Sequence, residues 1–435
     1  MSWNEIHAAS PVVEKTAGDR VNPTPRPYQI AGRDFLALRT RALLADEMRV
    51  GKTPQAILAA EKIGAKNVLV LCPAIAVPHW RREWMKWAPA SRIDLGVMSY
   101  DRARRAWQAG DLKSLRWDVL IVDEAHFCKN PKAARTQMVY GNSGLGHQAG
   151  SIWALSGTPV TKHAAELWAM LRAFGVTGLT YDQFVRKHCT GYYDLQRREF
   201  CITGTKTSAT AEVRDMLTQV MLRRTRQEVA PDMPLIGFEF LEVETEKRVD
   251  LSPPELSWLD SDAALLDWVE SQAGSCATNR PAVAEAKVPG LADEITFAVG
   301  NNLLKQTVVF GWHKEPLQLL SWRLNKNGID AAVINGDTSP KRRETIQKDF
   351  RDGRVKVIVA NILAAGTAID LSAANHGYFL ELDWVPGNNM QAANRLVSLQ
   401  KPWPITFDVV TCPGTIDDRV QRVLVKRVNE INQII

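Results

Sequence analysis

The sequence of 435 residues lacks three features that would each assign a class of protein at once. No apolar run approaches the roughly 20 residues of a membrane span, and the N-terminus has no signal-peptide core. We therefore expect a cytoplasmic protein without a membrane partner. The six cysteines lie far apart without the paired spacing of a zinc site, which favours free thiols in a reducing compartment. The net charge is only +6, which does not by itself require a polyanionic partner.

Length and composition describe an ordinary globular protein. A chain of 435 residues is expected to form two or three domains, since single cores stop growing well below that length. Hydrophobic residues make up 45% and charged residues 23%, which is typical of folded proteins. The sequence contains no internal repeat and no long low-complexity tract, so function must be sought in local motifs.

The tripeptide Gly51-Lys52-Thr53 follows a short apolar run, residues 42–45, and precedes a helical pattern over residues 54–65. A glycine at a strand-to-helix turn lets backbone N–H groups approach a phosphate, and the helix N-terminus attracts negative charge. The lysine would then reach the β- and γ-phosphates, and the threonine hydroxyl would bind Mg²⁺. The full phosphate-loop pattern begins with a glycine, and Asp46 occupies that position here. Alone, the tripeptide is equally compatible with an ordinary loop.

Apolar runs of strand length recur along the following part of the chain, and helical patterns separate them. They cover residues 68–72, 119–122 and 151–155. The tryptophans at 80, 84 and 87 have helical spacing, which favours a core stripe over a ligand platform. Strands alternating with helices predict a parallel sheet whose functional site lies at the carboxyl ends of its strands.

Two acidic residues, Asp123 and Glu124, end the second of these runs. An aspartate there can hold Mg²⁺, and the adjacent glutamate can polarise the water that attacks a γ-phosphate. Paired acids also occur as solvated turn residues. The order of the motifs nevertheless favours a nucleotide-hydrolysis site, because the pair lies downstream of Gly51-Lys52-Thr53 and upstream of Ser156-Gly157-Thr158-Pro159.

Together with Pro27-Tyr28-Gln29, these motifs resemble those of superfamily-2 helicases. The segments Asp46-Glu47-Met48 and Glu166-Leu167-Trp168 narrow the resemblance to the Swi/Snf-type DNA translocases. The resemblance implies an α/β protein with two RecA-like parallel-sheet lobes and a small helical insertion between them. It also implies ATP and Mg²⁺ as ligands and DNA as the partner, so we expect a cytoplasmic, DNA-associated protein.

The resemblance also implies a role for individual residues. Catalysis is assigned to Lys52, Asp123, Glu124 and Arg395, and Mg²⁺ binding to Thr53 and Asp123. ATP binding is assigned to Gln29, Asp46, Glu47, Met48, Arg49, Val50, Gly51, Lys52 and Thr53. The coupling of nucleotide state to DNA is assigned to His126, Ser156, Thr158 and Gln391, and DNA contact to Gly366 and Thr367. Arg49 departs from the glycine that is usual at its position. Gln29 could pair its amide with the donor and acceptor edges of adenine.

The expected domains follow from the same patterns. We expect a flexible N-terminal arm over residues 1–24 and a first lobe over residues 25–235, mainly helical from about residue 161. A linker or insertion is expected over residues 236–286, and a second lobe over residues 287–435. Strand patterns in the second lobe lie at residues 307–310, 331–334, 355–360, 378–380 and 405–410.

Three functions remain open on the sequence. The favoured one is an ATP-driven motor that moves on or remodels double-stranded or branched DNA with little sequence specificity. The second is a nucleotide-gated DNA clamp, and the third is a motor subunit whose task is set by a partner. The clamp gains support from Ser398, because the family has a second arginine there, three residues after Arg395. A serine supplies no positive charge to the γ-phosphate, so weak intrinsic ATP hydrolysis would result.

Overall fold

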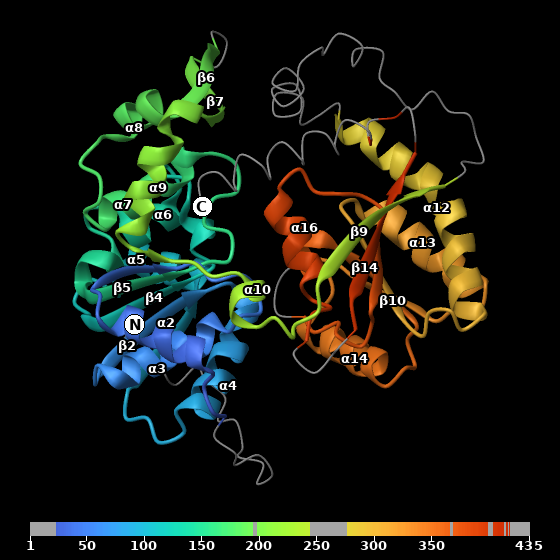
Figure 1. The fold of residues 1–435 in the computed structure, drawn as a ribbon, viewed down its shortest axis with the longest axis horizontal. Coiled ribbons are helices and arrows are strands. Elements are labelled where there is room, and N and C mark those ends of the chain that lie inside the picture. The colour runs from blue at the N-terminus through green and yellow to red at the C-terminus, as the bar shows by residue number, and fades with distance from the viewer. Residues whose placement is uncertain are drawn as a thin grey trace. The chain divides into compact units, whose positions relative to one another are not determined.

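The computed structural model describes residues 23–194, 198–243, 276–365, 369–398 and 403–412, together with Thr415 and Asp417. The chain divides into two units, with the boundary between Ala230 and Pro231 (Figure 1). The expected N-terminal arm lies, apart from its last two residues, outside the described residues. Within the described ranges, no helix has both the length and the apolar character needed to cross a bilayer.

The first unit contains a six-stranded parallel sheet with the order β3-β2-β4-β5-β1-β8. Its strands are β1 (Arg41–Leu44), β2 (Asn67–Cys72), β3 (Asp94–Ser99), β4 (Trp117–Asp123), β5 (Ala149–Leu155) and β8 (Met221–Leu222). The central strands are almost continuously buried, as expected for a sheet covered on both faces. The predicted strands at residues 42–45, 68–72, 119–122 and 151–155 are confirmed, each within a few residues at its ends.

Helices cover both faces of this sheet because successive strand residues point in opposite directions. On one face, Val68 and Val70 share a core with α2 (Pro27–Ala37), α3 (Lys52–Lys62) and α4 (Val77–Trp87). On the other face, Leu69 and Leu71 share a core with helices that include α5 (Tyr100–Ala109), α6 (Ala134–Tyr140) and α7 (Trp168–Ala173). Trp80 and Trp84 are buried in the first core, so the predicted core role of this tryptophan stripe is confirmed for these two.

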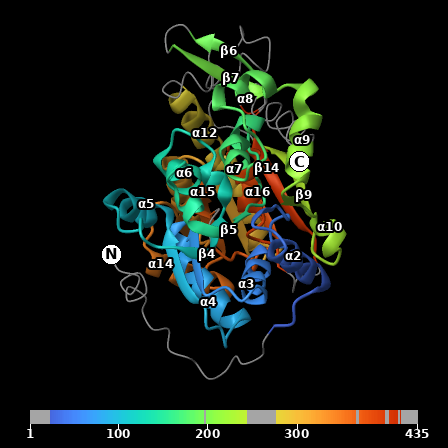
Figure 2. The same cartoon turned by 90° about the vertical axis from the view of Figure 1, so that its left-hand side faces the viewer.

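The part of the first unit after residue 161 contains several short helices and also a hairpin that the sequence patterns did not reveal. Its helices are the short 3₁₀ turn Ala164–Leu167, α7, α8 (Tyr181–His188), α9 (Thr210–Thr218) and α10 (Arg226–Val229). The hairpin joins β6 (Cys189–Asp194) to β7 (Glu199–Thr205) in antiparallel pairing. Figures 1 and 2 show these strands at the end of the unit, beyond α8 and away from the six-stranded sheet.

The second unit contains another six-stranded parallel sheet, with the order β11-β12-β10-β13-β14-β9. Its strands are β9 (Ile236–Glu242), β10 (Thr307–Gly311), β11 (Ala331–Ile334), β12 (Val357–Asn361), β13 (His376–Phe379) and β14 (Ile405–Thr411). Its helices are α12 (Cys276–Gly300), α13 (Lys314–Lys326), α14 (Pro340–Arg351), α15 (Ile362–Ala365) and α16 (Pro386–Ala393). The predicted pair of RecA-like parallel-sheet lobes is thereby confirmed.

The structure contradicts the expected linker of residues 236–286 at both ends. Strand β9 pairs with β14 along its whole length, so residues 236–242 belong to the second sheet. Residues 276–286 form the first turns of α12, where Val283 and Ala284 are buried. The small and polar residues of this segment suggested a linker, but burial of its apolar face favours a helix packed on the sheet, even with Pro281 inside it. The middle of the interval, residues 244–275, lies outside the described residues, and so does any helical insertion there.

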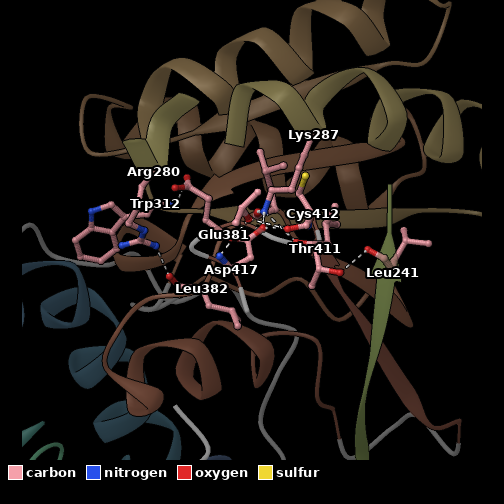
Figure 3. Close-up of polar contacts among 12 residues, drawn as sticks. Leu241, Arg280, Lys287, Trp312, Glu381, Leu382, Thr411, Cys412 and Asp417 are labelled. Atoms are coloured by element: carbon pink, nitrogen blue, oxygen red, sulfur yellow. Dashed lines mark hydrogen bonds and ion pairs between the residues drawn. The ribbon is translucent and has the colours of Figure 1, made fainter. Parts of the chain in front are cut away.

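Helix α12 is attached to the sheet by two buried cations (Figure 3). The side chain of Lys287 is 1% exposed, and its Nζ donates to the carbonyl oxygens of Leu380 (2.5 Å) and Val410 (2.9 Å) and to Oδ2 of Asp417 (2.8 Å). Nη2 of Arg280 donates to the carbonyl oxygen of Leu382 at 2.6 Å. A buried ammonium group is tolerated because each of its protons has an acceptor.

Candidate active site

The loop between β1 and α3 has two left-handed residues, Arg49 (φ 66°) and Gly51 (φ 83°). Gly51 is the N-cap of α3, and no side chain caps the helix there, so its first N–H groups are suited to an anionic ligand. A Cβ on Gly51 would lie 2.6 Å from Nε2 of Gln29. The loop therefore requires glycine at this position, and the predicted adenine-binding Gln29 lies directly against it. Thr53 stands in the first turn of the same helix.

The ammonium group of Lys52 lies among the other predicted residues. Its Nζ donates to the carbonyl oxygens of Asp46 (2.7 Å) and Glu47 (3.2 Å). Burial lowers the pKa of Lys52, and the carboxylates of Glu124, Asp46 and Asp123 act against that shift. A Cβ on Gly157 would lie 3.4 Å from the same Nζ, so the Ser156-Gly157-Thr158 segment approaches the loop closely. The lysine is thus held by groups that a phosphate could replace.

Asp123 ends β4, where two hydrogen bonds hold its carboxylate and a third holds its backbone. Nε1 of Trp80 donates to Oδ2 at 2.7 Å, and the backbone N–H of Glu124 donates to Oδ1 at 3.1 Å. The hydroxyl of Tyr100 donates to the carbonyl oxygen of Asp123 at 2.6 Å. Burial, followed by the charge of Glu124, raises the pKa of Asp123 to about 6. A divalent cation would offset both the burial of the Asp123 carboxylate and its repulsion by Glu124. The two carboxylates therefore fit the Mg²⁺ that the sequence implies.

The predicted coupling residues of the first unit form a chain that starts at Glu124. The backbone of Glu124 is left-handed (φ 50°), and its Oε2 lies 3.4 Å from Nδ1 of His126. The same Nδ1 lies 3.1 Å from Oγ of Ser156, which also accepts from the backbone N–H of Thr158 at 3.2 Å. Burial, followed by the charge of Lys129, lowers the pKa of His126 to about 4, so its ring is neutral at neutral pH. Glu124, the predicted catalytic carboxylate, is therefore linked to the Ser-Gly-Thr segment by direct contacts.

Asp46 and Glu47 of the loop bind arginines from the segment that follows β8. Arg224 donates to both carboxylate oxygens of Asp46, from Nε at 2.9 Å and from Nη2 at 2.5 Å. Arg226 binds Glu47 through its Nε (2.7 Å) and its backbone N–H (2.8 Å). The sequence assigned both acids to ATP binding, whereas the structure shows their side chains fixing the loop. This bidentate pairing explains how an aspartate can occupy the position of the first glycine.

The remaining loop and second-unit residues are placed as follows. Val50 is fully buried, and Met48 packs against Gly157. Gln391 is buried in α16, and Arg395 follows the end of that helix, where its carbonyl oxygen accepts from the N–H of Leu371 at 3.1 Å. Gly366 and Thr367 lie outside the described residues.

Sequence patterns missed the residues that hold Asp123, the predicted catalytic aspartate. Trp80 was interpreted only as core, although it also donates to Asp123, and Tyr100 was not considered. The only signal was the tryptophan stripe itself, and spacing cannot show which ring would reach a carboxylate on another strand.

Replacing Trp80 by phenylalanine should weaken Mg²⁺ binding, because the ring remains but the donor to Asp123 is lost. Partners of metal ligands typically contribute 10- to 100-fold in metal affinity or activity, so we expect a shift of about this size in a Mg²⁺ titration of ATP hydrolysis. Trp84→Phe is the matched control, since Trp84 is buried in the same helix and donates to Oγ of Ser91 at 3.4 Å. Equal shifts in the two variants would contradict the role of Trp80.

Comparison with known proteins gives matches in both parts of the chain. Residues 92–248 match the model of the SNF2-related domain, and residues 290–399 match the helicase conserved C-terminal domain. The chain is 28% identical over 431 residues to the SWI/SNF-related matrix-associated actin-dependent regulator of chromatin subfamily A-like protein 1 of Bos taurus, covering 94% of this chain and 44% of that protein. It is 25% identical over 436 residues to the DNA annealing helicase and endonuclease ZRANB3 of Mus musculus, covering 92% and 40%.

A bacterial relative has a length closer to that of this chain. The uncharacterized ATP-dependent helicase YqhH of Bacillus subtilis is 22% identical over 466 residues, covering 95% of this chain and 79% of that protein. By contrast, the chain spans less than half the length of the two animal proteins. The solved structure of a Sulfolobus solfataricus SWI2/SNF2 ATPase core in complex with dsDNA is similar over 97% of this chain and 95% of that one, with a TM-score of 0.43 and 20% identity.

Proposed function

We propose that this chain, whose residues 92–248 match the SNF2-related domain and whose residues 290–399 match the helicase conserved C-terminal domain, is a DNA-dependent ATPase that moves on or remodels double-stranded or branched DNA. The observation that carries the proposal is the arrangement around Lys52 in the first unit. An uncapped helix N-terminus, a buried ammonium group and the Asp123–Glu124 pair surround one loop. This combination suits phosphoryl transfer to water, which depends on positioning and charge stabilisation.

In this proposal each residue has a separate task. Lys52 and the first N–H groups of α3 hold the phosphates, and Gln29 reads the adenine. Thr53 and Asp123 would hold Mg²⁺, which neutralises charge on the phosphate oxygens. Glu124 takes the proton of the attacking water. The neutral ring of His126 passes the state of Glu124 to Ser156 and Thr158 through the contacts described above.

The second unit supplies the remaining residues of the proposal. Arg395 and Gln391 are assigned to ATP hydrolysis and its coupling to movement, and Gly366 and Thr367 to the DNA backbone. Contacts to phosphates rather than to base edges would give little sequence specificity. We propose, together with the resemblance to DNA-associated proteins, that the protein acts on DNA, and its cytoplasmic location stays a prediction from the sequence.

The direct test is ATP hydrolysis measured without DNA and with single-stranded, duplex and forked DNA. We expect hydrolysis to rise with duplex or forked DNA and to require Mg²⁺. A nucleotide-gated clamp predicts instead tight DNA binding that depends on ATP but little turnover on any DNA. The family relationship does not favour the clamp, and the intact set of Lys52, Asp123 and Glu124 supports turnover. Absence of hydrolysis on every DNA would contradict the proposal.

The affinity for duplex DNA should fall steeply with salt and depend little on sequence. Each neutralised phosphate contributes about −0.9 to the slope of log affinity against log salt concentration. We therefore expect a slope of several units, measured by fluorescence anisotropy at four or more salt concentrations. Two duplexes of unrelated sequence should give the same slope and similar affinity. A flat salt response, or a large difference between the duplexes, would show that base readout dominates.

A further inference from the structure

The β6–β7 hairpin concentrates the exposed aromatic side chains of the first unit. Tyr192 is 38% exposed, Tyr193 57% and Phe200 42%. In the described part of this unit, Phe127 is the only other aromatic side chain with comparable exposure. Because the hairpin lies at the end of the unit, away from the six-stranded sheet (Figures 1 and 2), its rings contribute little to the main core.

The hairpin presents its rings in fixed positions. Tyr193 and Phe200 are cross-strand partners, so their side chains lie on the same face of the ladder. A Cβ on Gly191 would lie 2.6 Å from Cε1 of Phe200, so the Phe200 ring extends over the Gly191 backbone. Tyr192 pairs with Cys201 and therefore lies on the opposite face. A ring over a glycine stabilises a hairpin, but it does not account for the exposure of all three rings.

The hairpin and the residues beside it in the sequence are cationic and polar rather than aliphatic. The sequence from residue 186 to residue 206 carries five lysines and arginines but only two acidic residues, and one of these cations, Lys187, forms an ion pair with Glu212 at 2.5 Å. Arg198 is exposed beside β7. The hydroxyl of Thr203 donates to that of Thr190 at 3.3 Å across the ladder. Aromatic rings among cations suit a strand of nucleic acid better than an apolar protein surface.

We propose that this hairpin is a stacking platform for unpaired bases of DNA, with its cations beside the phosphates. Bases inside a duplex are already stacked on one another, so the rings would select single strands and the open arms of a branch. The inference rests on the proposed function, because it identifies which part of a branched DNA the motor meets through this hairpin. The binding itself requires neither ATP nor the Lys52 site.

The test is the affinity for three labelled DNAs, measured by fluorescence anisotropy without ATP. The DNAs are a single strand, a blunt duplex and a fork with two single-stranded arms. A stacked base contributes about 5- to 150-fold in affinity. We therefore expect the double variant Tyr193→Ala/Phe200→Ala to bind the single strand and the fork at least about tenfold more weakly. Its affinity for the blunt duplex, and its duplex-stimulated ATP hydrolysis, should match those of the wild type.

Two further variants separate stacking from damage to the fold. Tyr193→Trp/Phe200→Trp keeps the rings and should retain binding to the single strand, whereas Trp322→Ala removes a ring that is 59% exposed in the second unit and should change nothing. Single-strand and fork affinities within twofold of wild type in the alanine variant would overturn the proposal, and so would an equal loss on the blunt duplex. Failure of the proposed function would instead be seen in the wild type, as no DNA-stimulated hydrolysis.

Discussion

Replacing Glu124 by glutamine should slow DNA-stimulated ATP hydrolysis by about 10²- to 10⁴-fold and leave ATP binding largely intact. The amide has nearly the same size as the carboxylate, but it cannot accept the proton of the attacking water. Lys52 and the N-terminus of α3, which we assign to the phosphates, remain unchanged. The measurement is the steady-state rate with saturating duplex DNA, together with a nucleotide-binding assay on the same preparations.

The exposed Glu344 on α14 offers a matched control for this experiment, because Glu344→Gln makes the same chemical change far from the loop in the sequence. It should retain the wild-type rate. If Glu124→Gln also hydrolyses ATP at the wild-type rate, Glu124 is not the base. If it loses ATP binding as well, its main contribution is to hold the loop.

Arg395→Ala should lower DNA-stimulated turnover, and Ser398→Arg should raise it. In GTPases an arginine placed on the γ-phosphate is worth about 10³- to 10⁵-fold in rate. If Arg395 provides the only such charge, we expect its loss to cost about 10³-fold. Ser398 stands where the family has its second arginine, so a restored guanidinium group should increase the wild-type rate by tenfold or more. The measurement is the turnover number at saturating ATP and DNA.

Ser398→Ala controls for the loss of the serine hydroxyl and should behave like the wild type. If the wild type already hydrolyses ATP rapidly and Ser398→Arg adds nothing, the missing arginine at position 398 does not limit the rate. In that case a group present in the wild type already supplies the positive charge to the γ-phosphate. The rate of Arg395→Ala then shows whether that group is Arg395.

Strands with continuous apolar sequence were predictable, because burial on both faces leaves a strong pattern. The edge strand β3 was not predicted, since Asp94, Gly96 and Ser99 interrupt its apolar residues. The hairpin was missed for a related reason. Its strands contain Gly191, Asp194 and Gly204, which are unfavourable in strands, and their pairing depends on the cross-strand contacts rather than on intrinsic propensity.

The active-site motifs were predictable because phosphate chemistry requires particular residue types at fixed spacing. Their supporting partners were not, because they are far away in the sequence. Trp80 is 43 residues from Asp123, and Arg224 is 178 residues from Asp46. No local pattern connects such pairs, and only the sheet order, which places β4 beside β2 and β8 beside β1, brings their segments together.

The buried ammonium of Lys287 also restricts how α12 can pack. An apolar helix face could slide along a sheet by one turn, about 5.4 Å, and still bury a similar area. Such a shift would carry Nζ away from the carbonyl oxygens of Leu380 and Val410, and would leave a charge in an apolar layer without acceptors. One lysine thus excludes the neighbouring registers that apolar packing alone would permit, and gives α12 a single position along the strands.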